Sequence, residues 1–427
     1  MITRIKTILN TLNISDFLMN WMKIHSEESF FIKQELDIRR ICETEEIVLT
    51  LYKDIHVHSD ENQTSDTKRG FASCTLNSSM SDEQITEMIS DTYFSAGFAK
   101  NEYFPLTEKT ECNLATSNKP LSINELEDAL LHVPADSQTF INSSEFFITN
   151  TTYRIVNSCG VDVSFSTTKY SGEFVVQSIL RDNVEIYQDF HFTDRDTDVP
   201  SCIKSLASQT LQTAKSRSLA ARYDSHIAPV SPETILLEGS CLSDFFHFYL
   251  KRCDASMIYP KYSDYKIGDC IGAPLSPVTI RLKSPVPYSS EGIALSNHVL
   301  IDNNVIQTIT GDNRMSHYIG QTATGSSEIF DIEINPGKDS YVDFTKQGAS
   351  LRIVNFSDFQ MDELSGQFGG EFRLAYYKQS PDSEEIPVTN GSVSANILDI
   401  IDTLSLSKET MSLNGYSGPK VIAYRQT

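Results

Sequence analysis

The sequence lacks both a long hydrophobic run and an excess of basic residues. No stretch approaches the roughly 20 apolar residues that a membrane-spanning helix needs, and the N-terminal segment has no small-residue cleavage site, so we expect a cytoplasmic protein. Lys and Arg number 35 against 57 Asp and Glu, which gives a net charge of −22. Acids outnumber bases by 33 to 20 before His226 and by 24 to 15 after it. Because phosphate binding depends on clustered basic charge, direct contact with nucleic acid or an anionic membrane is disfavoured.

Paired metal-binding motifs are also missing. The eight cysteines are scattered without a CxxC or CxxH pair, so we expect reduced cysteines that are mostly packed in the fold. The nine histidines form no HExxH or HExxxH motif. Their one close pair, His56 and His58, has the spacing of two metal ligands, but beside an acidic polar loop it is more typical of solvated surface.

Motifs for nucleophilic catalysis and phosphate binding are absent as well. There is no GxSxG turn, and no glycine-rich loop precedes Lys-Ser or Lys-Thr. The densest glycine cluster, residues 366–370, lies between predicted strands. One interpretation is a turn or bulge, and the other is a close approach of a second backbone, such as an extended peptide added to a sheet edge. The second interpretation makes Gly369, Gly370 and Glu371 candidates for lining a peptide cleft.

The chain has an ordinary globular composition, with 40 % hydrophobic residues, and its 427 residues are enough for two domains. Apolar spacing predicts helices in 2–12, 16–22, 123–133 and 199–222, and a capped helix from Ser81. Alternating residues from Ser29 onward predict an antiparallel sheet, with a hairpin turn at residues 157–160. We therefore expect an α+β fold in which residues 1–225 form an N-terminal antiparallel sheet with helices.

The second half of the sequence differs from the first in its pattern of apolar and turn-forming residues. Two prolines within residues 226–233 indicate a linker. After one helix in 242–253, short apolar runs separated by Gly, Pro, Asn and Asp predict a mainly β, barrel- or sandwich-like domain over residues 226–427. A further helix is predicted from about Ser394, followed by a last strand near the C-terminus.

Several segments, in this order, resemble one protein family. In the second half they are SSEGIALSNHVLIDNNV (289–305), INPGKDSYVDF (334–344), GQFGGEFRLAYY (366–377), IPVTNGSVSANILDIIDTL (386–404) and GYSGPKVIAY (415–424). In the first half they are RRICETEEIVLTLY (39–52), RGFASCTL (69–76) and IVNSCGVDVSF (155–165). Together they resemble the TldD/PmbA family, also called TldD/TldE, whose members are described as modulators of DNA gyrase and as peptide-maturation metalloproteases.

The resemblance also locates a departure. In the TldD branch, HExxxH on the helix after the linker binds zinc and supplies the general base, and a cysteine near the C-terminus completes the site. Here Glu238, Gly239 and Ser243 stand at the His, Glu and His positions, and residues 405–419 contain no cysteine. These side chains cannot reproduce a zinc site, so the resemblance implies the TldE/PmbA branch, with no catalytic or metal-binding residues in this chain.

The resemblance implies a two-subunit metalloprotease in the cytoplasm. A TldD-like partner would bind zinc, and this chain, without a cofactor of its own, would form part of a chamber that cleaves small or unfolded peptides. Two alternatives remain open. One is a homodimeric peptide-binding or regulatory protein. The other is a stand-alone hydrolase that uses Glu238, Cys241 and His247 from one helix, with Asp244 as a possible further member.

Overall fold

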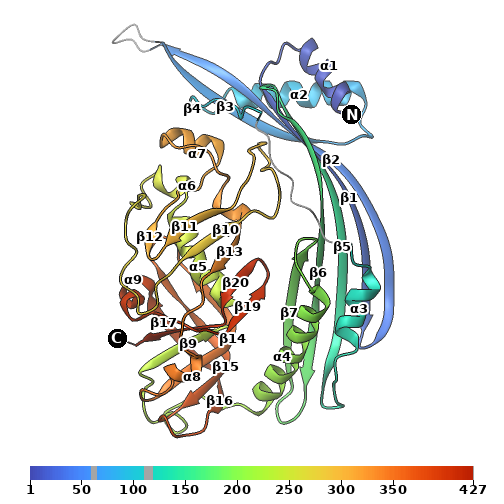
Figure 1. Ribbon diagram of the computed structural model, residues 1–427. Helices are drawn as coiled ribbons and strands as arrows, with labels where there is room; N and C mark the ends of the chain where they lie inside the picture. Colours follow the sequence, from blue (N-terminus) through green and yellow to red (C-terminus); the bar gives the residue numbers. More distant parts are fainter. Residues whose placement is uncertain (59–64, 110–118, 427) are drawn as a thin grey trace.

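A long, curved antiparallel sheet dominates the first half of the chain. The computed structural model describes residues 1–58, 65–109 and 119–426. Within them, the sheet has the strand order β4-β3-β2-β1-β5-β6-β7, and Figure 1 shows β1 and β2 bowing along one side of the molecule. The strands are β1 (Phe17–Ile32), β2 (Glu35–His58), β3 (Ser65–Leu76), β4 (Asn101–Glu102), β5 (Thr139–Asn157), β6 (Asp162–Ser178) and β7 (Val184–Thr193).

In the described part of the first half, four helices pack against this sheet in two separate clusters. They are α1 (Ile2–Thr11), α2 (Asp82–Ala96), α3 (Ile123–Leu131) and α4 (Val199–Leu219). Residues of α1 and α2 share one apolar core with the N-terminal part of β1, and residues of α3 and α4 share another with β5, β6 and β7. The predicted capping box of α2 is confirmed, because the Ser81 hydroxyl accepts from the Gln84 amide and the Gln84 side chain accepts from the Ser81 amide.

The predicted helix in residues 16–22 is wrong, because this segment is the start of β1. Met19 pairs with Leu49 of β2 on one side and with Val156 of β5 on the other, and its side chain is fully buried. Pairing on both sides satisfies the backbone along the whole strand. This tertiary context overrides the local helical spacing of the apolar residues.

The second half contains two mixed sheets, so the expected α+β fold with a mainly β C-terminal part is confirmed. One sheet has the order β12-β11-β10-β13-β20-β19, and the other has β18-β21-β9-β14-β15-β16-β8, with β17 also paired to β15. Their strands are β8 (Ala221–Arg222), β9 (Thr234–Glu238), β10 (Ile280–Lys283), β11 (His298–Asp302), β12 (Val305–Ile306), β13 (Asp331–Ile334), β14 (Ser350–Met361), β15 (Gln367–Lys378), β16 (Ile386–Thr389), β17 (Gly391–Asn396), β18 (Ser405–Leu406), β19 (Thr410–Leu413), β20 (Tyr416–Pro419) and β21 (Val421–Arg425).

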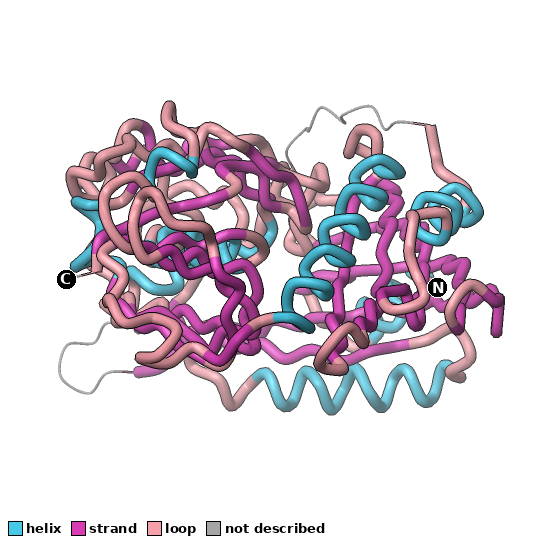
Figure 2. The backbone as a smooth tube through the Cα atoms, turned by 90° about the horizontal axis from the view of Figure 1, so that it is seen from below, coloured by secondary structure: helices cyan, strands magenta, loops and turns pink. Residues whose placement is uncertain are grey.

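Strands run through both halves of the molecule in Figure 2. Helix α5 (Cys241–Arg252) lies in the core of the second half. Its aromatic residues Phe245, Phe246 and Tyr249 are fully buried in a core that draws on both sheets. The other helices of the second half are short: α6 (Ala255–Ile258), α7 (Asn313–Tyr318), η1 (Ser327–Ile329), α8 (Tyr341–Phe344), α9 (Ile397–Ile400) and η2 (Ile401–Thr403). The helix predicted from Ser394 begins three residues later, because β17 pairs with β15 up to Asn396.

The two halves are joined by specific contacts. Asn414 of the β19–β20 turn accepts from the His191 amide and donates to Asp189, both in β7. Strand β8, on the N-terminal side of the predicted boundary at 225/226, pairs with β16 of the C-terminal sheet. The boundary itself stays a prediction. No helix within the described residues is both long and apolar enough to cross a membrane.

Candidate functional site

Glu238 lies at the end of β9, before the helix on which the sequence resemblance had placed it. Its Oε2 accepts from Arg352 Nη1 at 2.7 Å, and its Oε1 lies 3.1 Å from Lys420 Nζ. Arg352 also pairs with Glu385 at 2.6 Å and lies over the rings of Tyr341 and Tyr376. Both carboxylate oxygens of Glu238 are therefore already held by cationic side chains.

The other two candidate positions offer no metal ligand of the expected kind. Gly239, with φ +95°, makes the turn between β9 and α5. Ser243 lies in the first turn of α5, and its carbonyl contacts His247 Nδ1 at 2.9 Å. A paired carboxylate, a glycine and a serine do not fit a zinc site that needs two imidazoles. In the described parts of the chain, no group of three or more His, Cys, Asp and Glu could hold a metal ion.

The residues of the alternative hydrolase do not share one helix. Helix α5 begins at Cys241, so the expectation that Glu238 extends the same helical face is wrong. The Cys241 side chain is buried, and burial raises the pKa of its thiol far above the ordinary value. A thiol in such a position is inert, because the thiolate is the nucleophile. The other described cysteines are also unbridged, and Cys112 lies outside the described residues.

Gly369, Gly370 and Glu371 line an open groove of about 700 Å³. Strands β14, β15 and β17 form it, and its lining also includes Asp358, Asp362 and residues 392–394. The sequence offered no signal for these additional residues, because they come from different strands. Among the described lining residues there are three carboxylates and no Lys or Arg, so the groove is acidic.

The glycines allow the protein's own strands to approach closely. An added Cβ would lie 1.9 Å from the Asp358 carbonyl oxygen at Gly370, and 2.2 Å from the Val393 carbonyl oxygen at Gly369. Gly369 pairs with Gln360 of β14 and with Ser394 of β17, so its backbone is enclosed by strands on both sides. Within the described chain, the outer edge of β17 has no partner strand and is the available edge beside the groove.

A smaller hollow connects this groove to helix α5. Asp244 and His247 line it together with Phe359, Glu363 and two residues shared with the groove, Gln360 and Met361. Burial raises the pKa of the Asp244 carboxyl, and the nearby His247 opposes this shift. The solvent-facing side of α5 therefore adjoins the groove, whereas Glu238 is committed to its ion pairs with Arg352 and Lys420.

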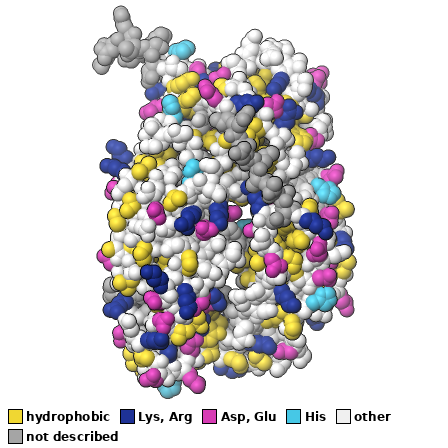
Figure 3. All heavy atoms as spheres, in the orientation of Figure 1, with side chains coloured by type: hydrophobic (Ala, Val, Ile, Leu, Met, Phe, Trp, Pro, Cys, Tyr) yellow, Lys and Arg dark blue, Asp and Glu magenta, His cyan; other side chains and the backbone are white. Residues whose placement is uncertain are grey.

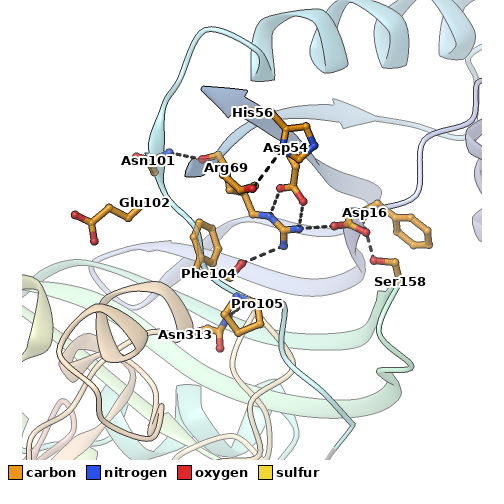
Figure 4. Close-up of polar contacts among 12 residues, drawn as sticks. Asp16, Asp54, His56, Arg69, Asn101, Glu102, Phe104, Pro105, Ser158 and Asn313 are labelled. Atoms are coloured by element: carbon orange, nitrogen blue, oxygen red, sulfur yellow. Dashed lines mark hydrogen bonds and ion pairs between the residues drawn. The ribbon is translucent and has the colours of Figure 1, made fainter. Parts of the chain in front are cut away.

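A buried arginine organises a second polar cluster, at the junction of the two halves (Figure 4). Arg69 is 3 % exposed and donates to Asp54 at 2.7 Å, to Asp16 at 2.6 Å and to the Phe104 carbonyl at 3.0 Å. With its donors satisfied inside the protein, this cluster has a structural role. The nearby His56 contacts Thr67, and the side chain of His58 lies outside the described residues.

The face of the molecule shown in Figure 3 has no concentrated basic patch among its described residues. On the face shown in Figure 3, Lys and Arg side chains are dispersed among Asp and Glu. This distribution agrees with the acidic composition of both halves. Fold and site together define a protein with two mixed sheets around a central helix, whose expected zinc positions carry side chains that do not fit zinc.

Comparisons with known proteins assign this architecture. Residues 233–425 match the family model of the PmbA/TldA metallopeptidase C-terminal domain. This C-terminal part of the chain is therefore similar in sequence to the PmbA/TldD metallopeptidases. A search of curated proteins by sequence found no match.

Three solved structures are similar over nearly the full length. TldE from Thermococcus kodakarensis has a TM-score of 0.72 and 14 % identity, covering 99 % of this chain and 98 % of that one. A putative modulator of DNA gyrase from Thermotoga maritima has a TM-score of 0.73 and 15 % identity, and the match covers 99 % of this chain and 98 % of that one. A putative modulator of DNA gyrase from Bacteroides thetaiotaomicron has a TM-score of 0.74 and 12 % identity, and the match covers 99 % of this chain and 97 % of that one. At these identities the likeness shows the shared fold.

Proposed function

We propose that this chain is the TldE-like, non-metal subunit of a TldD/TldE-type metallopeptidase in the cytoplasm. The observation that carries the proposal is the identity and bonding of the residues at the three positions where the TldD branch has its zinc-binding motif. Glu238 is bound by Arg352 and Lys420, and neither Gly239 nor Ser243 replaces an imidazole ligand. A TldD-like partner with HExxxH would supply the metal and the general base. This chain would contribute part of the wall of the peptide chamber.

The groove beside α5 supports a role in holding peptide. Its volume is within the range of ligand sites, and the outer edge of β17 can accept an extended strand through backbone hydrogen bonds without reading sequence. Asp358, Asp362 and Glu371 place negative charge along it. We therefore propose small or unfolded peptides as substrates, with basic peptides favoured over acidic ones.

The test uses the purified chain, an HExxxH-bearing relative from the same genome, and their equimolar mixture. Zinc content is measured by elemental analysis, and cleavage is measured on two unstructured peptides that differ only in Lys or Glu at the variable positions. We expect no stoichiometric zinc and no cleavage with this chain alone. The mixture should cleave both peptides, the basic one faster, and should lose activity with a chelator.

Two results would contradict the proposal. One is stoichiometric zinc in the isolated chain together with chelator-sensitive cleavage. The other is full activity of the HExxxH relative that this chain does not increase. A homodimeric peptide-binding protein remains the alternative, since the same groove would serve it without chemistry. Peptide binding by the isolated chain, with no gain in cleavage on mixing, would favour that alternative.

A further inference from the structure

The outer edge of β3 is open near its C-terminal end. Strand β2 pairs with β3 along its whole length, but β4 pairs only with Lys68 and Arg69. The next residue, Gly70, is covered by backbone at the end of α2. From residue 71 to residue 76, no strand of the described chain pairs with this edge. At about 3.4 Å per residue, the open edge is about 20 Å long.

Helix α2, which Figure 1 shows beside this end of the sheet, forms the second wall of a groove along the open edge. Ala72 points toward α2, since its partner Leu51 belongs to the core beneath that helix. Ser73 points to the opposite face, where its hydroxyl contacts Thr50. Both line one hollow of about 390 Å³, so the hollow extends around the outer edge of the strand. The other lining residues are Met80, Gln84, Glu87, Met88, Asp91, Thr92 and Ser95.

The charge of the groove is negative. Glu87 and Asp91 lie one helical turn apart, and within the described residues neither carboxylate has an ion-pair partner. Like charges at this spacing oppose helix formation slightly, and a cationic side chain between them removes the repulsion. The groove lining contains no Lys or Arg. Arg4, which donates to the Met80 carbonyl at 2.8 Å, is already paired with Asp82.

Apolar side chains extend this surface along α2. Met80 and Met88 line the groove, and their flexible thioether side chains adapt to different partners. Phe94 follows Glu87 by two helical turns and therefore lies on the same face of α2. Phe94 and Phe98 are 67 and 72 % exposed, and their rings pack edge to face at 5.1 Å. Contiguous exposed apolar side chains of this kind mark interaction sites.

We propose that the groove between β3 and α2 binds an extended basic peptide as an added strand. The peptide backbone pairs with residues 71–76, because unpaired N–H and C=O groups of an edge accept a strand of any sequence. Its Lys or Arg side chains contact Glu87 and Asp91, and an apolar side chain packs on Met88. The site shares no residue with the groove of β14, β15 and β17, and it does not rest on the proposed function.

Hydrogen–deuterium exchange of the full chain locates the bound peptide. The probe is a short unstructured peptide of Lys, Leu and Ser, and the comparison peptide has Glu in place of Lys. We expect the Lys peptide to slow amide exchange in residues 71–76 and the Glu peptide to leave it unchanged. Unchanged exchange in this segment at saturating Lys peptide would overturn the inference. Equal protection on raising the protein concentration without peptide would also overturn it, because that result assigns the edge to contact between chains.

A double charge reversal, Glu87→Lys with Asp91→Lys, tests the charge contact. Both side chains are exposed on α2, so the fold should be retained, which thermal unfolding checks. The Lys peptide concentration that gives half-maximal protection of residues 71–76 should rise at least about tenfold. The matched control reverses two other exposed acids, Asp128→Lys with Glu384→Lys, and should behave as wild type. An equal rise in the control, or no rise in the α2 variant, would refute recognition by Glu87 and Asp91.

Discussion

At the scale of single residues, Glu238 has a structural role, because its carboxylate belongs to an ion-pair network. Its carboxylate is 14 % exposed and is shared between Arg352 and Lys420, and Arg352 in turn holds Glu385. A partly buried ion-pair network of this kind tolerates the loss of one member poorly, because the remaining charges lose their partner. The same network explains why Glu238 is not available to a metal or a substrate.

The variant Arg352→Met tests how much this ion-pair network contributes to stability. Removal of the guanidinium leaves Glu238 and Glu385 without their main partner, so we expect the free energy of unfolding to fall by about 3 kcal/mol. The measurement is urea-induced unfolding at neutral pH. Arg154→Met is the control, since Arg154 pairs with Asp162 at 2.9 Å but both side chains are almost half exposed, and the loss should stay below about 1 kcal/mol. Equal losses in the two variants would contradict the argument.

At the scale of elements, the close packing of β14, β15 and β17 requires glycine in β15. Gly369 and Gly370 lie in β15 where β14 and β17 approach from either side. The sequence left open whether this cluster serves a turn or the approach of another backbone. The structure shows close approach between strands of the same chain, and the peptide-binding hypothesis therefore moves to the outer edge of β17.

Gly370→Ala should strongly destabilise this sheet. The new Cβ would lie 1.9 Å from the Asp358 carbonyl oxygen, which is backbone and cannot rotate away. We expect a loss of about 3 kcal/mol or more, because β14 must shift, as in other overpacked sites. Gly160→Ala is the control, since its Cβ meets nothing within 4 Å and only its φ of +93° opposes alanine, at about 1 to 2 kcal/mol. Thermal unfolding measures both, and a smaller effect at Gly370 would refute the packing argument.

At the scale of the whole molecule, the two halves meet at a seam that contains a titratable group. Glu291 lies in the turn that packs on Val161 of the β5–β6 connection, and its carboxylate accepts from the backbone N–H of Asn313 at 2.8 Å. Burial raises the pKa of the Glu291 carboxyl to about 7, and Asp312 adds to the shift. The hydrogen bond from Asn313 and the positive charge of Arg314 oppose it.

This shift predicts a pH-dependent stability. The folded state holds a proton that the unfolded state releases near pH 4.5, so the contribution of Glu291 to stability falls as pH rises from about 4.5 to 7 and is then constant. Glu291→Gln should therefore be about 2 kcal/mol more stable than wild type at pH 8 and nearly equal at pH 5. Chemical unfolding at both pH values measures this. The exposed Glu384→Gln is the control, and a difference that does not change with pH would exclude the titration of Glu291.

The sequence by itself determined much of the local and compositional character of this protein. Periodicity and capping residues predicted α2, α3, α4 and α5, because these signals are local. The ordered motifs also predicted the family, and the acidic composition disfavoured nucleic-acid contact. The position of Glu238 with respect to helix α5 could not be predicted in this way.

Only the tertiary structure decided which residues meet. Residues 17–22 have helical spacing but form a strand, because β2 and β5 pair with them from distant parts of the chain. The groove combines three strands, and the ion pair from Glu238 to Arg352 joins residues 114 positions apart. Contacts of this kind depend on sheet topology and register, which no local pattern encodes.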